Sequence, residues 1–170
     1  HRDGRWVWVL ARGRVVQRDA EGRPLRMVGT NLDLTPSRVQ ERALRESEER
    51  FRAAYEHAPV GVVILDANGG ILRANPALCA MTGYTESELI ATGFDGLTHP
   101  EDQLINKEPL DDLRAGRAGT RQYEKRYIHK SGRIVWALVC VSAVREGPAE
   151  PTGFIGQILD ITEQRQVLAQ

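Results

Sequence analysis

The sequence has few cysteines, few aromatic residues and no long hydrophobic run. Its two cysteines, Cys79 and Cys140, stand outside the CxxC and Cys/His patterns of metal sites. We expect both to be reduced, small apolar side chains. No stretch approaches the roughly 18 apolar residues that a membrane-spanning helix needs. The sequence therefore predicts a cytoplasmic chain without membrane contact, while an anchor elsewhere in a longer parent protein stays open.

An excess of charge of one sign is also missing. Lys and Arg together number 23, as do Asp and Glu, so the formal net charge is zero. Without a net field the chain has no general attraction for nucleic acid or for an anionic membrane. Arg12, Arg14 and Arg18 are interpreted as the solvated face of a strand, and no nucleic-acid partner is expected.

Catalytic signatures are absent as well. The sequence contains no Walker loop, no GxSxG elbow and no nucleophile paired with a base. His57 precedes Ala58-Pro59 and lacks the helix expected around a phosphate-accepting histidine. The chain is predicted not to be an enzyme. A histidine kinase or a cyclic-di-GMP synthase or phosphodiesterase would lie elsewhere in the parent protein.

What the sequence does contain is a partial internal repeat. Residues 1–38 read HRDGRWVWVL…GTNLDLTPSR, and residues 129–165 read HKSGRIVWALV…GQILDITEQR. A repeat in fixed register indicates a duplicated structural unit, so residues 1–35 are predicted to be the C-terminal strands of an upstream domain. The matched positions include Trp8 with Trp136, Asp33 with Asp160, and Thr35 with Thr162.

The first third of the chain predicts two strands and a helix. Residues 5–17 and 25–34 alternate in character and are separated by a Gly- and Pro-containing loop. Thr35-Pro36 then indicates a helix start, and the charged segment 37–55 carries Glu and Arg four residues apart. Residues 36–50 form the predicted linker, either a solvated connector or a short coiled-coil seam between two copies.

The rest of the chain predicts one α+β domain at 51–165, followed by the start of an exit helix at 166–170. Strands are expected at about 60–66, 71–75, 121–130, 133–145 and 152–161. Helical spacing covers 76–91, with a break at Gly83-Tyr84, and a further helix runs from Thr98 to about Gly116. This order predicts one antiparallel sheet with short helices on one face.

Several motifs in this order resemble the PAS domain with its PAC tail. They are the stretch Ser47–Leu89, HPED at 99–102, HKSGRIVW at 129–136 and GFIGQILDIT at 153–162. The likeness covers about 47–165, and residues 1–35 resemble the same tail of an upstream copy. It implies a five-stranded sheet around a pocket, in a bacterial two-component sensor or diguanylate cyclase that signals through flanking helices.

Four residues are predicted to transmit the signal, at the points where a sheet leads into a helix. Asp160 and Thr162 end the last strand, with Thr162 expected as the helix N-cap, and Asp33 and Thr35 occupy the same places in the first copy. A cap at such a hinge could turn a small sheet movement into a helix rotation. A purely structural cap is compatible with the same residues.

A ligand pocket is the second predicted site, although the same side chains could simply form the core. Its candidate residues are Met81, Tyr84, Phe94, Leu104, Leu113, Tyr127, Trp136, Leu138 and Cys140.

The cofactor stays unknown: the sequence favours none, or a small molecule. Covalent flavin would require a cysteine within Asn-Cys-Arg, whereas Cys79 lies in Leu-Cys-Ala-Met, and Ile158 stands where the last-strand glutamine belongs. Haem would require a histidine on the helix at 101–116, which has none, and His99 is assigned to the preceding turn.

Three functional hypotheses remain. The chain is a ligand sensor, a ligand-free dimerisation and relay module, or, with least support, a flavin-based redox or light sensor. A homodimer through the linker helix and the N-terminal half-domain is also predicted, because Trp6 and Trp8 have no core of their own to join.

Overall fold

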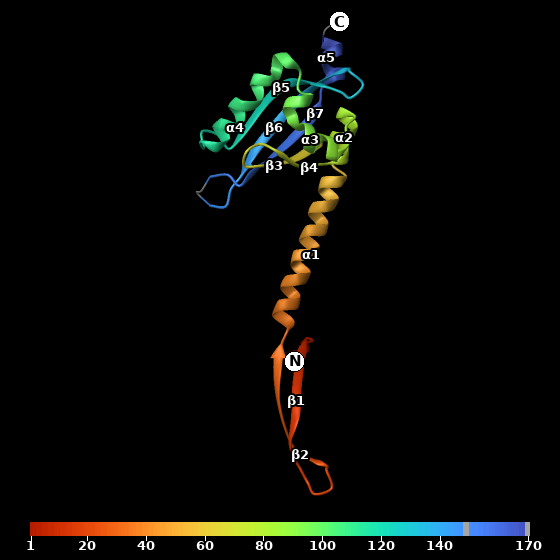
Figure 1. Ribbon diagram of the computed structural model, residues 1–170, viewed down its shortest axis with the longest axis vertical. Helices are drawn as coiled ribbons and strands as arrows, with labels where there is room; N and C mark the ends of the chain where they lie inside the picture. The colour runs from red at the N-terminus through yellow and green to blue at the C-terminus, as the bar shows by residue number, and fades with distance from the viewer. Residues whose placement is uncertain (148–149, 169–170) are drawn as a thin grey trace. The chain divides into compact units, whose positions relative to one another are not determined.

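The computed structural model describes residues 1–147 and 150–168 (Figure 1). The chain divides into two compact units, His1–Arg52 and Ala53–Gln170. Part of the predicted turn at 147–151 and the end of the predicted segment 166–170 lie outside the described residues. Within the described part, no helix has the length and apolar character required to cross a membrane.

The first unit contains a two-stranded antiparallel sheet and most of a long helix. Strands β1 (Val9–Arg18) and β2 (Pro24–Asp33) pair so that Gly13 lies opposite Gly29, and α1 (Thr35–Glu56) follows. The tight turn between the strands is closed by the Asp19 carboxylate, which accepts a hydrogen bond from the Arg23 backbone N–H at 2.7 Å. The sequence anticipated both strands and the helix, with β1 beginning later than expected.

Most apolar side chains of this unit are exposed. Every residue of β2 is exposed, and the exposed fraction of Trp6 reaches 92%. Two strands have no second layer on which to bury an apolar face, so a sheet of this size gains little from hydrophobic burial.

The second unit is built on a five-stranded antiparallel sheet in the order β4-β3-β7-β6-β5 (Figure 1). The strands are β3 (Gly61–Asp66), β4 (Ile71–Ala74), β5 (Thr120–Ile128), β6 (Ile134–Val144) and β7 (Gly153–Asp160). The predicted α+β class and the five-stranded sheet are therefore confirmed.

Short helices connect β4 to β5. They are α2 (Pro76–Thr82), α3 (Glu86–Leu97), the 3-10 helix η1 (Pro100–Asn106) and α4 (Lys107–Arg114), and α5 (Thr162–Leu168) closes the described chain. The sequence predicted one helix from Thr98 to Gly116, where the structure has two. Pro109 lacks a backbone N–H and is tolerated only in the first turn of a helix, which is consistent with a new α-helix starting at Lys107.

A fully buried asparagine joins the end of α1 to the sheet. The Asn75 side-chain oxygen accepts hydrogen bonds from the N–H groups of Val62 (2.7 Å) and Leu78 (3.0 Å). Its amide nitrogen donates to the carbonyl oxygens of Tyr55 (3.1 Å) and Val60 (3.0 Å). With four partners this side chain is fully satisfied, so it caps α2 and ties three chain segments together.

Candidate functional site

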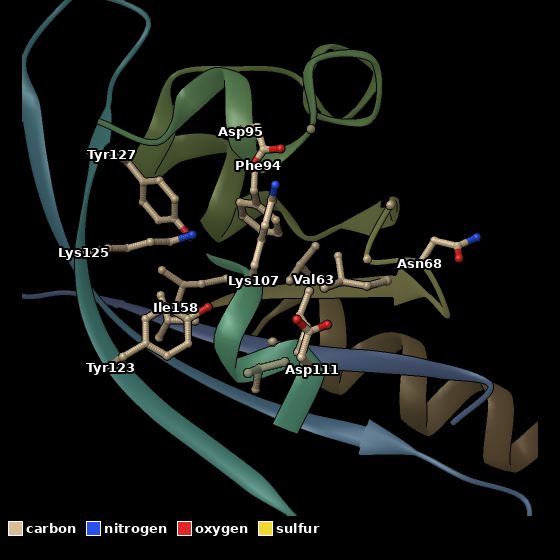
Figure 2. A pocket seen from close by; sticks show the side chains of 18 of the residues that line it. Val63, Asn68, Phe94, Asp95, Lys107, Asp111, Tyr123, Lys125, Tyr127 and Ile158 are labelled. Atoms are coloured by element: carbon tan, nitrogen blue, oxygen red, sulfur yellow. The ribbon is translucent and has the colours of Figure 1, made fainter. Parts of the chain in front are cut away.

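A cavity of about 460 Å³ lies against one face of the five-stranded sheet (Figure 2). Its apolar wall comes from β3, β6 and β7, through residues such as Val63, Val139 and Ile158. Residues of α3 and α4 form the opposite wall, Phe94 and Lys107 among them. This volume falls in the usual range of pockets for small molecules, about 300–1,000 Å³.

Three alternate residues of β5 project into this cavity, namely Tyr123, Lys125 and Tyr127 (Figure 2). Side chains two apart on a strand point to the same face, so the strand presents all three to one space. The Lys125 side chain is 2% exposed. Its ammonium nitrogen lies 4.6 Å from the ring centroid of Tyr127, 4.8 Å from that of Phe94 and 5.9 Å from that of Tyr123.

Burial changes the acid–base properties of Lys125. Removing the ammonium group from water lowers the pKa of this side chain to about 7, although the carboxylates of Asp95 and Asp102 act in the opposite direction. Near neutral pH the group is therefore poised between its charged and neutral forms. The aromatic faces around it supply cation–π attraction for the charged form.

The tyrosines beside Lys125 are also perturbed. Burial raises the pKa of Tyr123 to about 12 and raises that of Tyr127 well above its ordinary value. The Tyr127 ring stacks on Phe94 with a centroid distance of 5.9 Å. Its hydroxyl oxygen is buried and makes no hydrogen bond to the described residues. A buried hydroxyl in that state is costly, by roughly 1–3 kcal/mol.

Charged residues of α4 complete the lining. Lys107, Asp111 and Arg114 all border the cavity, and an ion pair of 2.9 Å joins Arg114 to Asp111. Arg114 also donates a hydrogen bond to the carbonyl oxygen of Ala67, in the turn between β3 and β4. This side chain therefore fixes α4 to the sheet at the border of the cavity.

Two of the nine predicted pocket residues, Phe94 and Tyr127, line the cavity. Leu104 is 83% exposed, and Leu113 is fully buried in the core. Met81 and Tyr84 pack against the core without lining the cavity. The remaining three, Trp136, Leu138 and Cys140, alternate on β6 with the fully or nearly buried residues Val135, Ala137, Val139 and Val141.

Sequence reasoning missed Tyr123 and Lys125. A lysine in a strand is normally assigned to the solvent side. The available signal was its position between Tyr123 and Tyr127 in the same alternating set, with the charged Glu124 and Arg126 on the other face.

The predicted exit residues form a defined hydrogen-bonded corner between sheet and helix. The Asp160 carboxylate accepts a hydrogen bond from the backbone N–H of Thr162 at 2.9 Å. The Thr162 hydroxyl oxygen accepts the backbone N–H of Trp136 at 3.0 Å. The expectation that Thr162 caps the helix with its own side chain is therefore wrong: Asp160 satisfies the helix N–H, and Thr162 joins the helix to β6.

The Trp136 ring contacts two arginines. The guanidinium carbon of Arg126 is 5.5 Å from its ring centroid, and that of Arg165 on α5 is 4.5 Å away. Arg126 also binds Asp102 of η1 through two side-chain hydrogen bonds of 2.7 and 3.0 Å. A continuous series of contacts thus leads from η1 over β5 and β6 to α5. We call these four residues, Asp102, Arg126, Trp136 and Arg165, the relay series.

The first unit repeats the corner at its own sheet-to-helix junction. Asp33 accepts the Thr35 N–H at 2.8 Å, and Thr35 accepts the Trp8 N–H at 2.9 Å. The guanidinium carbon of Arg38 lies 4.9 Å from the Trp8 ring centroid. The internal repeat of the sequence therefore corresponds to a repeated hydrogen-bond pattern.

The residues present do not fit a flavin adduct or an axial haem ligand. Ile158 lines the cavity, whereas Gln157 is exposed and Cys79 lies outside the lining. His99 Nδ1 accepts the Glu101 N–H and thereby caps η1. Among the described residues, no cluster of His, Cys, Asp and Glu could hold a metal ion.

A five-stranded antiparallel sheet that borders a cavity on one face and leads into an outgoing helix is the arrangement expected of a PAS sensor module. The comparisons with known proteins agree. A PAS fold family model matches residues 49–161, and a second PAS fold model matches residues 1–31. The chain belongs to the PAS family.

Its curated relatives are large signalling proteins. The chain is 38% identical over 129 residues to the probable diguanylate cyclase DgcE of Escherichia coli (strain K12), which covers 76% of this chain and 12% of that protein. It is 36% identical over 124 residues to the sensor histidine kinase TmoS of Ectopseudomonas mendocina, covering 73% and 13%. The chain thus spans about an eighth of each of these two proteins.

Solved structures support the fold. The PAS domain of a Colwellia psychrerythraea protein matches with a TM-score of 0.60 at 23% identity, over 68% of this chain and 97% of that one. The Rhodobacter sphaeroides LOV protein matches with a TM-score of 0.60 at 21% identity, over 72% and 70%. At these identities the likeness concerns the fold alone.

Proposed function

We propose that this chain is a ligand-sensing relay, in which a small molecule in the cavity changes the docking of α5. The observation that carries the proposal is the relay series. Asp102 belongs to η1, which leads directly into the cavity-lining residue Lys107, and Arg165 belongs to the outgoing helix. Neighbouring residues of β5 connect the cavity to the relay series. Lys125 faces the cavity, and Arg126 contacts Asp102 and Trp136.

The physical basis is that strand β5 faces the cavity on one side and carries a residue of the relay series on the other. A ligand that presses on Tyr123, Lys125 or Tyr127 acts on the strand that also carries Arg126. Arg126 and Arg165 both stack on Trp136, so movement of β5 relative to β6 changes the surface on which α5 docks. A packed interface of this kind shifts between discrete arrangements and does not deform continuously.

The output enzyme is proposed to lie outside this chain, in the parent protein. The relatives named as a diguanylate cyclase and a sensor histidine kinase support such an arrangement, because the matched region is a small part of each. The chain's own contribution would then be the bias that it places on α5.

Filling the cavity from within tests the relay without knowledge of the ligand. Val139 lines the cavity, and Val139→Phe adds bulk there. We expect the variant to change the hydrogen-exchange protection of the α5 amides several-fold. Val144→Phe is the matched control, because Val144 is on the same strand, 39% exposed and outside the lining.

A second substitution tests the route. Adding Trp136→Leu to Val139→Phe should remove the effect on α5, because it removes the ring on which both arginines stack. Folding of each variant is checked by its thermal transition. A folded Val139→Phe protein with unchanged α5 exchange would contradict the proposed relay.

A further inference from the structure

The proposed function leaves the chemistry of the ligand open, and the polar groups of the cavity narrow it. We propose that the cavity binds a monocarboxylic acid with an apolar body, its carboxylate held by the Lys125 ammonium group and the Tyr127 hydroxyl. This inference rests on the proposed sensing function and adds the class of ligand.

The first observation is the location of Lys125. Its side chain is almost fully buried and lies between two aromatic residues of the same strand face, Tyr123 and Tyr127. Burying an ammonium group costs free energy unless an anion or strong acceptors compensate it. The carboxylates of Asp95 and Asp102 already favour the ammonium form of Lys125, so its surroundings suit a cation beside anions. An anionic ligand beside it would add compensation where it is most effective, in a space of low dielectric.

The second observation is independent and concerns Tyr127. Its hydroxyl is buried and makes no hydrogen bond to the described residues, although buried polar groups are normally satisfied. Figure 2 shows this side chain and Lys125 reaching the same part of the cavity, where the ammonium nitrogen lies 4.6 Å from the Tyr127 ring centroid. A carboxylate oxygen accepts from both an O–H and an ammonium donor.

The remaining lining fixes the sign of the charge and the character of the ligand body. The lining has three basic residues, Lys107, Arg114 and Lys125, and two acidic ones, Asp95 and Asp111. Asp102 also acts on Lys125, but it lies outside the lining and is paired with Arg126. The lining alone therefore carries one more basic than acidic side chain, which favours an anionic ligand. Opposite the polar groups, aliphatic side chains of the sheet form the wall, including Val63, Val139 and Ile158. An aromatic or branched aliphatic body would bury apolar surface there.

The test compares acids with their neutral amides on the full 170-residue chain. The probes are benzoate, phenylacetate and 3-methylbutanoate, each paired with its primary amide of nearly the same shape. Isothermal titration at pH 6.5 should show at least one acid binding tenfold or more tightly than its amide. If no acid binds, or if amides bind as tightly as acids, the proposal is overturned.

Variants locate the effect. Lys125→Met should abolish the preference for the acid while leaving amide binding within about twofold, and Tyr127→Phe should weaken acid binding about fivefold, the value of one hydrogen bond near 1 kcal/mol. Lys130→Met is the control, because Lys130 is exposed, pairs with Glu88 and lies outside the lining. An acid preference that survives Lys125→Met would refute the assignment. Thermal unfolding confirms that each variant is folded.

Proton uptake provides a readout that a merely structural lysine would not move. At pH 8 the free protein holds Lys125 mostly neutral, because its pKa is about 7. Binding a carboxylate favours the ammonium form, so the protein should take up close to one proton on binding. The binding enthalpies observed in phosphate and in Tris should then differ by the difference between the ionisation enthalpies of the two buffers. The neighbouring groups are Asp95 of α3, Asp102 of η1, Tyr123 and Tyr127 of β5, and Lys107, Asp111 and Arg114 of α4.

The two proposals can fail separately. If neutral amides bind and alter α5 exchange as well as acids do, the ligand class is wrong and the sensing function stands. If acids bind with the expected preference and α5 exchange does not respond, the ligand class stands and the relay is wrong.

Discussion

The guanidinium carbon of Arg165 lies 4.5 Å from the ring centroid of Trp136. This contact attaches the first turn of α5 to strand β6. An ion pair between Arg165 and Glu124 of β5 reinforces it. Because Trp136 is also bonded through its backbone to Thr162, the side chain and the main chain of one residue both hold α5.

Thr162→Val should loosen this corner without unfolding the domain. The change removes the acceptor of the Trp136 N–H, a loss of about 1 kcal/mol in local stability. Native-state hydrogen exchange should then show the Trp136 amide about fivefold less protected. Thr162→Ser keeps the hydroxyl and should keep the protection, so equal exchange in the two variants would contradict the assigned role.

The equivalent change in the first unit is Thr35→Val. There the Trp8 N–H loses its acceptor. We expect a comparable loss of protection at Trp8 and none at Trp136, since each corner is closed by its own residues. Altered exchange at Trp136 in this variant would show that the corners are not independent.

Asn75→Ala should be the most destabilising single change proposed for the second unit. It leaves four backbone groups without their buried partner, and we expect a loss of about 3 kcal/mol or more in the free energy of unfolding. Thr82→Val is a suitable comparison, because Thr82 is equally buried but makes one hydrogen bond, to the Leu78 carbonyl. Urea denaturation measures both free energies of unfolding, and equal losses would contradict the role assigned to Asn75.

Lys125 should make stability depend on pH in a defined direction. Its pKa is about 7 in the folded state against 10.5 as the ordinary value, so between these values the unfolded chain binds more protons. Stability conferred by this residue therefore rises with pH above about 7, by at most about 1.4 kcal/mol per pH unit. Below pH 7 both states hold the proton and the effect is constant.

The measurement is the difference in unfolding free energy between the natural protein and Lys125→Met, from pH 6 to 9.5. The difference should be flat at first and then move in favour of the natural protein. Asp95, Asp102, Tyr123 and Tyr127 are present in both proteins, and burial keeps the two tyrosines protonated in the folded state over this range. A difference that does not vary with pH would mean that Lys125 is not desolvated.

Self-association remains a prediction. In the first unit Trp6, Val39 and Leu44 are 92%, 61% and 62% exposed. Exposed apolar side chains of this kind are typical of contact surfaces, and we expect a homodimer in sedimentation velocity at about 10–100 μM, the range of weak dimers. Leu44→Glu should shift the equilibrium toward monomer. A monomer throughout this range would count against the dimer.

The order of the elements and the repeat could be predicted because they depend on local chemistry. Gly and Pro mark the turns, and Asp-x-Thr recurs at both sheet-to-helix junctions. The role of each side chain in the corner was less predictable. Thr162 is a good N-cap by type, but its hydroxyl contacts Trp136, a residue 26 positions earlier.

The α+β class, the sheet and the positions of the two sheet-to-helix junctions follow from the sequence alone. Which residues face the cavity depends on the tertiary packing. Strand β6 is apolar on both faces, so its alternation cannot reveal the inner one, and Val139 and Val141 line the cavity while Cys140 does not. Lys125 became part of the site because three rings, two from its own strand and one from α3, surround its ammonium group. That environment exists only once distant segments have packed together.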